Sequence, residues 1–296
     1  MDRNRFPFAA PIENIPQSDL LPLVIGPLSI TNAVLQQHPS AYLTAAKVAD
    51  RFRIPYLHTV RSPLSVNAFD GDEFDSTMVR WLQVFPFVDD SALRALVKRA
   101  ESCGFSAFVL SFIDPFDSVA SIFDDHRNVY RNFESAPLDL GGLRSSNVKS
   151  LLEQKQFVPS TIQAVRSFTE KAIIAHIPIT QRELIFEAMR EDVDAVCVVI
   201  DEYMPFASFI DAIQAIQRSA AKKIPIYADG SSFTEEEVVR LIAHGVERVM
   251  IDQPVVWGLT IDGFEGIANV VNIYKTNLFN ARCKGLFSDI FSRAGT

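Results

Sequence analysis

The sequence contains little cysteine and little histidine, and each scarcity excludes a class of protein. Three cysteines, Cys103, Cys197 and Cys283, are odd in number and far apart in 296 residues, so they do not form a disulfide framework. The five histidines show no metal-binding spacing such as H-x-x-x-H. We therefore expect a protein of a reducing compartment, and we expect no metal site.

Long apolar runs and an excess of positive charge are also missing. No run approaches the roughly 18 apolar residues that span a bilayer, and the N-terminal "MDRNRFPFAAPIENIPQ" contains prolines and acids instead of a signal peptide's apolar core. The C-terminal "AGT" does not match the peroxisomal S-K-L address. A net charge of -8 argues against a nucleic-acid surface. These features predict a soluble cytoplasmic protein that binds neither membrane nor nucleic acid.

What the sequence does contain is a regular alternation of short apolar runs and helical patterns. The hydrophobic content of 48% provides enough material for one large core. Eight runs, each followed by a helical pattern, predict a (β/α)8 TIM barrel in a single domain. The runs are residues 21–26, 56–60, 81–85, 107–113, 172–176, 195–200, 224–228 and 248–251.

Helix-start signals and one irregular stretch complete this organisation. Thr234 followed by Glu237 predicts a capping box, and Ser160 and Thr180 are candidate starts of two other helices. Residues 1–20 form a short N-terminal segment before a barrel over residues 21–296. Within the barrel, residues 114–157 are long, polar and punctuated by glycine, which predicts a loop insertion that acts as a lid or a subunit contact.

Several segments resemble a known enzyme family. Asp229-Gly230 and the stretch "PVVWGL" from Pro254 to Leu259 match a family pattern that reads roughly V-F-L-D-G-G-V-R and then V-F-I-G-R-P-V-V-W-G-L. Further upstream, "RWLQVFPF" and the following helix match the family segment R-W-L-Q-L-Y. The chain thus resembles the FMN-dependent 2-hydroxy acid oxidase and dehydrogenase family of the glycolate oxidase type, from about residue 21 to residue 287.

The resemblance implies a set of roles for individual residues. In the family, the positions of Gln83, His176, Asp229 and Gly230 contact FMN, so these four are the candidate cofactor-binding residues. Each of them also has a purely structural explanation. Family members commonly assemble as tetramers, so the resemblance implies a homo-oligomer.

Departures from the family pattern concentrate where the chemistry takes place. The family's substrate tyrosine falls on Phe85, its phosphate-binding arginine on Phe233, its Gly-Arg pair on Asp252-Gln253, and its flavin lysine on His176. The segment from Val199 to Pro205, "VIDEYMP", is shorter than the family's S-N-H-G-x-R-Q-L-D. The base that takes the substrate hydroxyl proton and the arginine that holds its carboxylate have no counterparts there. Asp201 and His176 are the only weak catalytic candidates.

Three hypotheses account for this pattern. The first is an inactive, hydroxy acid oxidase-like barrel with weakened or lost FMN binding, which acts by binding a protein partner or a small molecule. The second is an enzyme with replaced chemistry, because six polar residues are expected at or just beyond carboxyl-terminal strand ends. The third retains FMN-dependent oxidation of a small 2-hydroxy acid. The six residues are Asp114, His176, Asp201, Glu202, Asp229 and Asp252.

Overall fold

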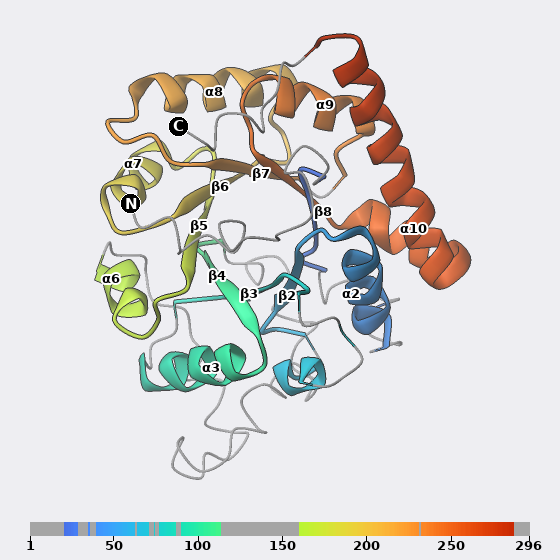
Figure 1. Cartoon of the computed structure of the whole chain (residues 1–296). Helices are drawn as coiled ribbons and strands as arrows, with labels where there is room; N and C mark the ends of the chain where they lie inside the picture. Colours follow the sequence, from blue (N-terminus) through green and yellow to red (C-terminus); the bar gives the residue numbers. More distant parts are fainter. Residues whose placement is uncertain are drawn as a thin grey trace.

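The computed structural model describes residues 21–28, 35, 40–62, 64–70, 74, 77–86, 90–113, 160–230 and 232–286. Within these residues the strands form a closed ring at the centre of the molecule and the helices lie outside it (Figure 1). The N-terminal segment 1–20 and the insertion 114–157 expected from the sequence lie outside the described residues.

Eight parallel strands pair in sequence order, and the sheet closes where β8 pairs with β1. The first and last strands pair over three residues, from Leu23 opposite Val249 to Ile25 opposite Ile251. The predicted (β/α)8 barrel is therefore confirmed. The strands are β1 (Leu23–Ile25), β2 (Tyr56–Thr59), β3 (Arg80–Val84), β4 (Phe105–Ser111), β5 (Ala172–Pro178), β6 (Ala195–Val199), β7 (Ile226–Asp229) and β8 (Arg248–Ile251).

Amphipathic helices cover the outside of this barrel. In α8 the side chains of Phe209, Ile213 and Ile216 are fully buried at helical spacing, so this face of the helix packs into the core. The described helices are α2 (Ser40–Phe52), the 3-10 helix η3 (Val66–Phe69), α3 (Asp90–Ser102), α6 (Ser160–Arg166), α7 (Arg182–Arg190), α8 (Phe206–Ser219), α9 (Glu235–Ala243) and α10 (Gln253–Cys283).

One sequence expectation about these helices needs correction. Thr180 does not cap a helix, because α7 begins at Arg182 and its N-cap, Gln181, makes no side-chain capping bond. After β2, the described residues contain the short 3-10 helix η3. The capping box at α9 is confirmed, since Thr234 accepts from the Glu237 amide and the Glu237 side chain accepts from the Thr234 amide.

The barrel interior is a packed apolar core. Because side chains alternate between the two faces of a strand, every second residue points inward. The rings of Trp81 and Tyr227 stack at the centre, with centroids 5.9 Å apart and planes 10° apart. Both side chains are 1% exposed. The interior cluster is Val24, Leu57, Trp81, Ala107, Val109, Ala172, Ile174, Ala195, Cys197, Tyr227 and Met250.

The long helix α10 consists of two segments that meet at a kink. Asp262 and Gly263 have non-helical backbone angles, and Gly263 has a φ of 52°. The kink brings Gly258 and Gly266 into direct backbone contact, so that a Cβ on Gly266 would lie 1.9 Å from the Gly258 carbonyl oxygen. The second segment packs against α2, where Arg51 contacts Glu265 at 3.3 Å.

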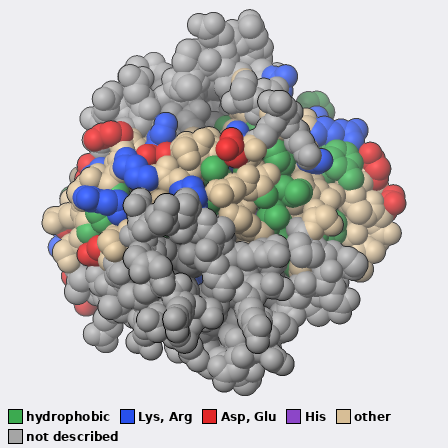
Figure 2. Space-filling model, turned by 90° about the horizontal axis from the view of Figure 1, so that it is seen from below, with side chains coloured by type: hydrophobic (Ala, Val, Ile, Leu, Met, Phe, Trp, Pro, Cys, Tyr) green, Lys and Arg blue, Asp and Glu red, His purple; other side chains and the backbone are tan. Residues whose placement is uncertain are grey.

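On the face shown in Figure 2, the described lysine and arginine side chains lie interspersed with acidic and hydrophobic ones. None of the described helices, including α10, has the length and apolar character needed to cross a bilayer. Phe112, directly after the end of β4, is 7% exposed and belongs to the core cluster that includes the buried helix faces, whereas Phe116, Phe123 and Phe133 lie outside the described residues.

We expect Gly266→Ala to destabilise the barrel. The added methyl group meets the Gly258 carbonyl at a distance that no Cβ tolerates, so the two segments of α10 must move apart. Overpacking of this kind costs about 1–3 kcal/mol. Urea unfolding followed by circular dichroism measures the loss. Asn269→Ala, an exposed position in the same segment, serves as the control and should change stability by less than about 0.5 kcal/mol.

Candidate functional site

A polar layer, buried except for the half-buried Asp252, lies at the carboxyl-terminal end of the barrel. Each of its members follows an inward-facing apolar residue by two positions, so the alternation of the strands directs it into the mouth. In barrels of this architecture, catalytic and binding residues sit at this end. The layer contains Thr59, Gln83, Ser111, His176, Asp229 and Asp252.

Ser111, His176 and Asp229 form a continuous hydrogen-bonded array within this layer. Nδ1 of His176 lies 2.9 Å from Oγ of Ser111, and Nε2 lies 2.8 Å from Oδ2 of Asp229. Ser111 and His176 are register partners on the adjacent strands β4 and β5, whereas Asp229 ends β7. The three residues are 1%, 3% and 9% exposed.

The chemistry of the partners fixes the direction of these bonds. A carboxylate oxygen only accepts, so Nε2–H of His176 donates to Asp229. In a neutral imidazole the other nitrogen is then an acceptor, and the hydroxyl of Ser111 donates to Nδ1. His176 is therefore held at both nitrogens by protein groups.

Asp252 places a carboxylate at the start of α10. Its side chain caps the helix by accepting from the Gln253 amide. Burial, together with the nearby carboxylate of Asp229, raises the pKa of Asp252 to about 7. The helix terminus that follows β8 is thus occupied by a side chain of the protein itself.

An aromatic ring occupies the space next to Gly230. A Cβ on Gly230 would lie 2.4 Å from the ring of Phe233. This ring is held by Phe206 and Phe209 of α8, each with its centroid 5.9 Å away, and Phe233 is 5% exposed. The position that carries arginine in the family pattern therefore belongs to the hydrophobic core.

The helix after β7 does not begin at Gly230. It begins at Glu235, and its first amides are already capped by Thr234 and by the carboxylate of Glu237. Ser231, whose amide could contact a phosphate, lies outside the described residues. The described residues thus offer no free helix N-terminus at this point.

A phosphate group does not fit the described residues at this end of the mouth. Phe233 brings an apolar ring where a cation is needed, and Asp252 brings a carboxylate. The ring end of the site is different, because Gln83, 7% exposed, retains an inward polar side chain on β3. The described mouth thus combines an inward polar side chain on β3 with an apolar ring and a carboxylate near the ends of β7 and β8.

Arg61 is a polar residue of the mouth that the sequence reasoning missed. It lies two residues beyond the end of β2 and is 8% exposed. Its guanidinium group stacks on the ring of Phe85, 3.8 Å from the centroid. Phe85 stands where the family pattern has a substrate tyrosine. The sequence signal that could have identified Arg61 is its position, two residues after an inward-facing residue of a strand.

The acidic residues predicted at the mouth are only partly brought together. Asp229 and Asp252 interact, but Asp201 and Glu202 are exposed in the loop after β6. Oδ1 of Asp201 accepts from the Tyr203 amide at 3.0 Å, which is a local turn. Asp114 lies outside the described residues. Among the described residues, no three His, Cys, Asp or Glu side chains are arranged to hold a metal ion.

Two other histidines have structural positions. His58 is fully buried among the rings of Tyr42, Tyr56, Phe69 and Phe105, and burial lowers its pKa to about 4. His244 is the C-cap residue of α9. His38 and His126 lie outside the described residues.

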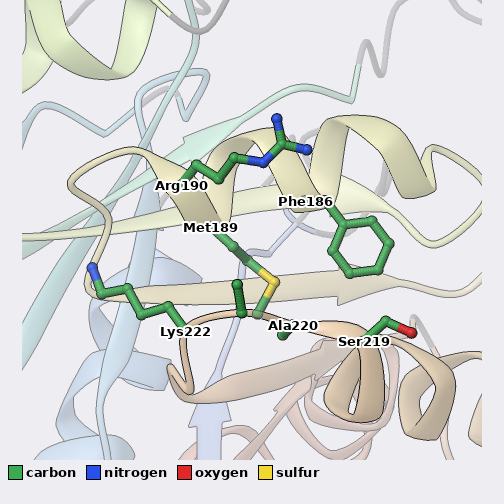
Figure 3. Close-up of a pocket in the computed structure, with 7 residues that line it drawn as sticks. Phe186, Met189, Arg190, Ser219, Ala220 and Lys222 are labelled. Atoms are coloured by element: carbon green, nitrogen blue, oxygen red, sulfur yellow. The ribbon is translucent and has the colours of Figure 1, made fainter.

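A separate pocket of about 520 Å³ lies on the outside of the barrel (Figure 3). It is lined by Phe186, Met189 and Arg190 of α7 and by residues 219–222 at and just after the end of α8. These helix ends lead back toward the amino-terminal ends of the strands, opposite the polar mouth. We therefore place the candidate functional site at the mouth.

Comparison with known proteins agrees with the fold and with the sequence pattern. The family model described as FMN-dependent dehydrogenase matches residues 17–138 and 203–281, which is more than half of the chain. The chain belongs to this family. It is an FMN-dependent 2-hydroxy acid oxidase-like TIM barrel.

Proteins similar to this chain include oxidases from animals and plants. Human 2-hydroxyacid oxidase 2 is 26% identical over 214 residues, which cover 68% of this chain and 58% of the human protein. Glycolate oxidase 3 of Oryza sativa subsp. indica is 25% identical over 281 residues, which cover 87% of this chain and 72% of the rice protein. The chain thus spans less than two thirds of the length of the human relative and more than two thirds of the length of the rice relative.

A solved structure of mandelate oxidase has the same fold. It superposes with a TM-score of 0.70 over 89% of this chain and 74% of that protein, at 20% sequence identity. The family match is interrupted between residues 138 and 203. The interruption contains His176 and Asp201, the two weak catalytic candidates of this chain.

We expect Asp252→Asn to stabilise the folded state above neutral pH. The ordinary pKa of 3.8 rises to about 7 on folding, so ionisation of Asp252 opposes folding as pH increases from 4 to 7. Three pKa units give an upper bound of about 4 kcal/mol. The amide oxygen of asparagine keeps the cap.

Urea unfolding of the wild type and the variant at pH 4 and pH 8 measures this effect. The stability difference should be large at pH 8 and close to zero at pH 4. Asp201→Asn is the matched control, because it also removes a carboxylate that accepts a backbone amide, but at an exposed turn. A difference that is equal at the two pH values would show that ionisation of Asp252 is not its cause.

Proposed function

We propose that this barrel, a relative of the FMN-dependent hydroxy acid oxidases, does not catalyse the oxidation of 2-hydroxy acids. Its FMN binding is weakened or lost, and it acts as a binding protein. The observation that carries the proposal is the composition of the mouth at its phosphate end. There the ring of Phe233 fills the space beside Gly230, and the carboxylate of Asp252 caps α10.

Electrostatics supports weak binding of a phosphorylated cofactor. Two unit charges about 4 Å apart repel by roughly 4 kcal/mol at an effective dielectric constant of 20. This energy corresponds to about a thousandfold loss of affinity. Above its pKa of about 7, Asp252 would oppose a phosphate at the start of α10 in this way.

The residues around the reacting centre support the absence of hydroxy acid oxidation. Phe85 carries no hydroxyl group, and the segment from Val199 to Pro205 provides an exposed aspartate instead of a base and an arginine. General base catalysis contributes about 10²–10⁴-fold, and loss of a carboxylate clamp removes orientation as well. At the ring end, Gln83, His176, Asp229 and Gly230 remain the proposed contacts to any flavin that does bind.

The binding function concerns a small molecule at the mouth or a protein partner. Large apolar side chains are exposed on α10 and in the loop after β6, with Ile261 at 82% and Tyr203 at 87% exposure. Trp257 on α10 is 54% exposed. These side chains support self-association or a protein contact as part of the proposed function.

The alternative function is an active flavin-dependent oxidoreductase on a small 2-hydroxy acid. Arg61 is the observation that favours it, since a buried arginine at the mouth is a possible substitute for the missing substrate clamp. FMN, when bound in such an enzyme, accepts the hydride equivalent of the hydroxy acid. In this chain His176, locked between Ser111 and Asp229, would stand where the family pattern has a lysine.

We expect the purified protein to show no flavin absorbance between 300 and 550 nm, and FMN to bind no more tightly than riboflavin. The two ligands share one ring system and differ only in the phosphate group, so their affinity ratio reports the phosphate site alone. Titration with both ligands, followed by flavin and tryptophan fluorescence, measures this ratio. FMN that binds more than about tenfold more tightly than riboflavin would contradict the proposal.

Loss of hydroxy acid oxidation has an independent test. With FMN added at a saturating concentration under anaerobic conditions, glycolate and lactate are expected to leave the flavin absorbance near 450 nm unchanged. Reduction of the flavin by either substrate would establish the alternative function. Arg61→Leu would then be expected to weaken it, because the leucine cannot bind a carboxylate.

A further inference from the structure

We infer that Ser111, His176 and Asp229 form a nucleophile, base and orienting carboxylate capable of acyl transfer from small, uncharged carboxylic esters. This activity goes beyond the proposed binding function and needs no flavin. It rests on the two hydrogen bonds that join the three side chains, 2.9 Å from Ser111 to His176 and 2.8 Å from His176 to Asp229.

The order of donors and acceptors is the one that such a reaction requires. Asp229 accepts a hydrogen bond from Nε2–H of His176, which fixes the tautomer of the imidazole. Nδ1 is therefore left to accept a hydrogen bond from the hydroxyl group of Ser111. A hydroxyl group hydrogen-bonded to a base that is itself oriented by a third group is the general signature of an activated nucleophile. The two nitrogens of the imidazole exchange roles relative to the common serine triad, but each still makes the bond that its role demands.

Burial strengthens this array. All three residues are at most 9% exposed, and they lie above an apolar interior cluster. In such surroundings the charge of Asp229 acts on the imidazolium form of His176 with little screening by water. The position at the carboxyl-terminal end of β4, β5 and β7 is where barrels of this type carry out chemistry.

The reaction balances without a cofactor. Oγ of Ser111 attacks the carbonyl carbon of the ester while its proton passes to Nδ1 of His176. The bond to the leaving alcohol breaks, and the alcohol takes that proton, which leaves an acyl-serine. Water then attacks the acyl group, loses a proton to His176, and releases the acid as Ser111 regains its proton. The net change is an ester and water to an acid and an alcohol.

The electrostatics of the mouth restricts the substrate class. Asp229 belongs to the array and Asp252 lies nearby, and burial together with the charge of Asp229 raises the pKa of Asp252. An anionic ester would be repelled there above neutral pH. A small neutral ester such as p-nitrophenyl acetate is therefore the probe of choice.

The experiment mixes the full chain with p-nitrophenyl acetate and follows p-nitrophenolate release, then maps acetylated residues by mass spectrometry. The expected result is a burst of about one equivalent and an acetyl group on Ser111. Ser111→Ala should abolish both the burst and this label. His176→Asn should slow acetylation about 10²–10⁴-fold, the usual range for loss of a general base.

Ser106→Ala is the matched control. Ser106 lies on the same strand and donates to the Arg80 carbonyl at 3.2 Å, away from the array, so its loss should leave the burst unchanged. Asp229→Asn should slow acetylation by removing the negative charge that stabilises protonated His176, and Asp229→Glu should restore part of the rate. If the carboxylate were merely structural, Asp229→Asn and Asp229→Glu of equal thermal stability would acetylate at the same rate.

Acetylation confined to lysines or to the amino terminus, or a burst that persists in Ser111→Ala, would overturn the inference. If Ser111→Ala fails to fold, Ser111→Cys keeps a nucleophile of similar size. The introduced thiol should then carry a hydroxylamine-sensitive thioester, and its absence would equally overturn the inference. Because no step involves a flavin, the FMN titration leaves this result untouched, and a failure of either proposal can be told apart.

Discussion

Closure of the sheet between β1 and β8 is the constraint on which the rest of the structure depends. Once the ring is closed, the alternation of side chains along each strand sorts every strand residue into an interior and an exterior set. The interior set fills the lumen with apolar side chains up to the level of Trp81 and Tyr227. The polar residues of the mouth occupy the next inward positions, at the carboxyl-terminal end of the strands.

This confinement explains why residues far apart in the sequence meet. Ser111 and His176 are 65 positions apart, and His176 and Asp229 are 53 apart, yet each follows an inward apolar residue by two positions. A pair on adjacent strands in register comes within hydrogen-bonding distance as a direct result of the strand spacing. Asp229 joins them because its own strand, β7, ends at a comparable height.

The fold was predictable from the sequence because its signals are local. Apolar runs, a capping box and helical spacing each act within a few residues, and the structure places all eight strands close to the predicted runs. The arrangement of the mouth was less predictable. The family resemblance implied that Phe233 stands at an arginine position, but only the packing against Phe206 and Phe209 shows that its ring turns into the core beside Gly230. The stacking of Arg61 on Phe85 likewise depends on two strands at once.

The stacked rings of Trp81 and Tyr227 close the described part of the barrel below its polar layer. A molecule that approaches between the carboxyl ends of the strands meets this aromatic floor, beneath which the described interior is packed with apolar side chains. Entry and exit therefore share one opening. In a two-step reaction at Ser111 or His176, the first product must therefore leave through this opening before the second reactant binds. A single opening thus imposes an order on product release and reactant binding.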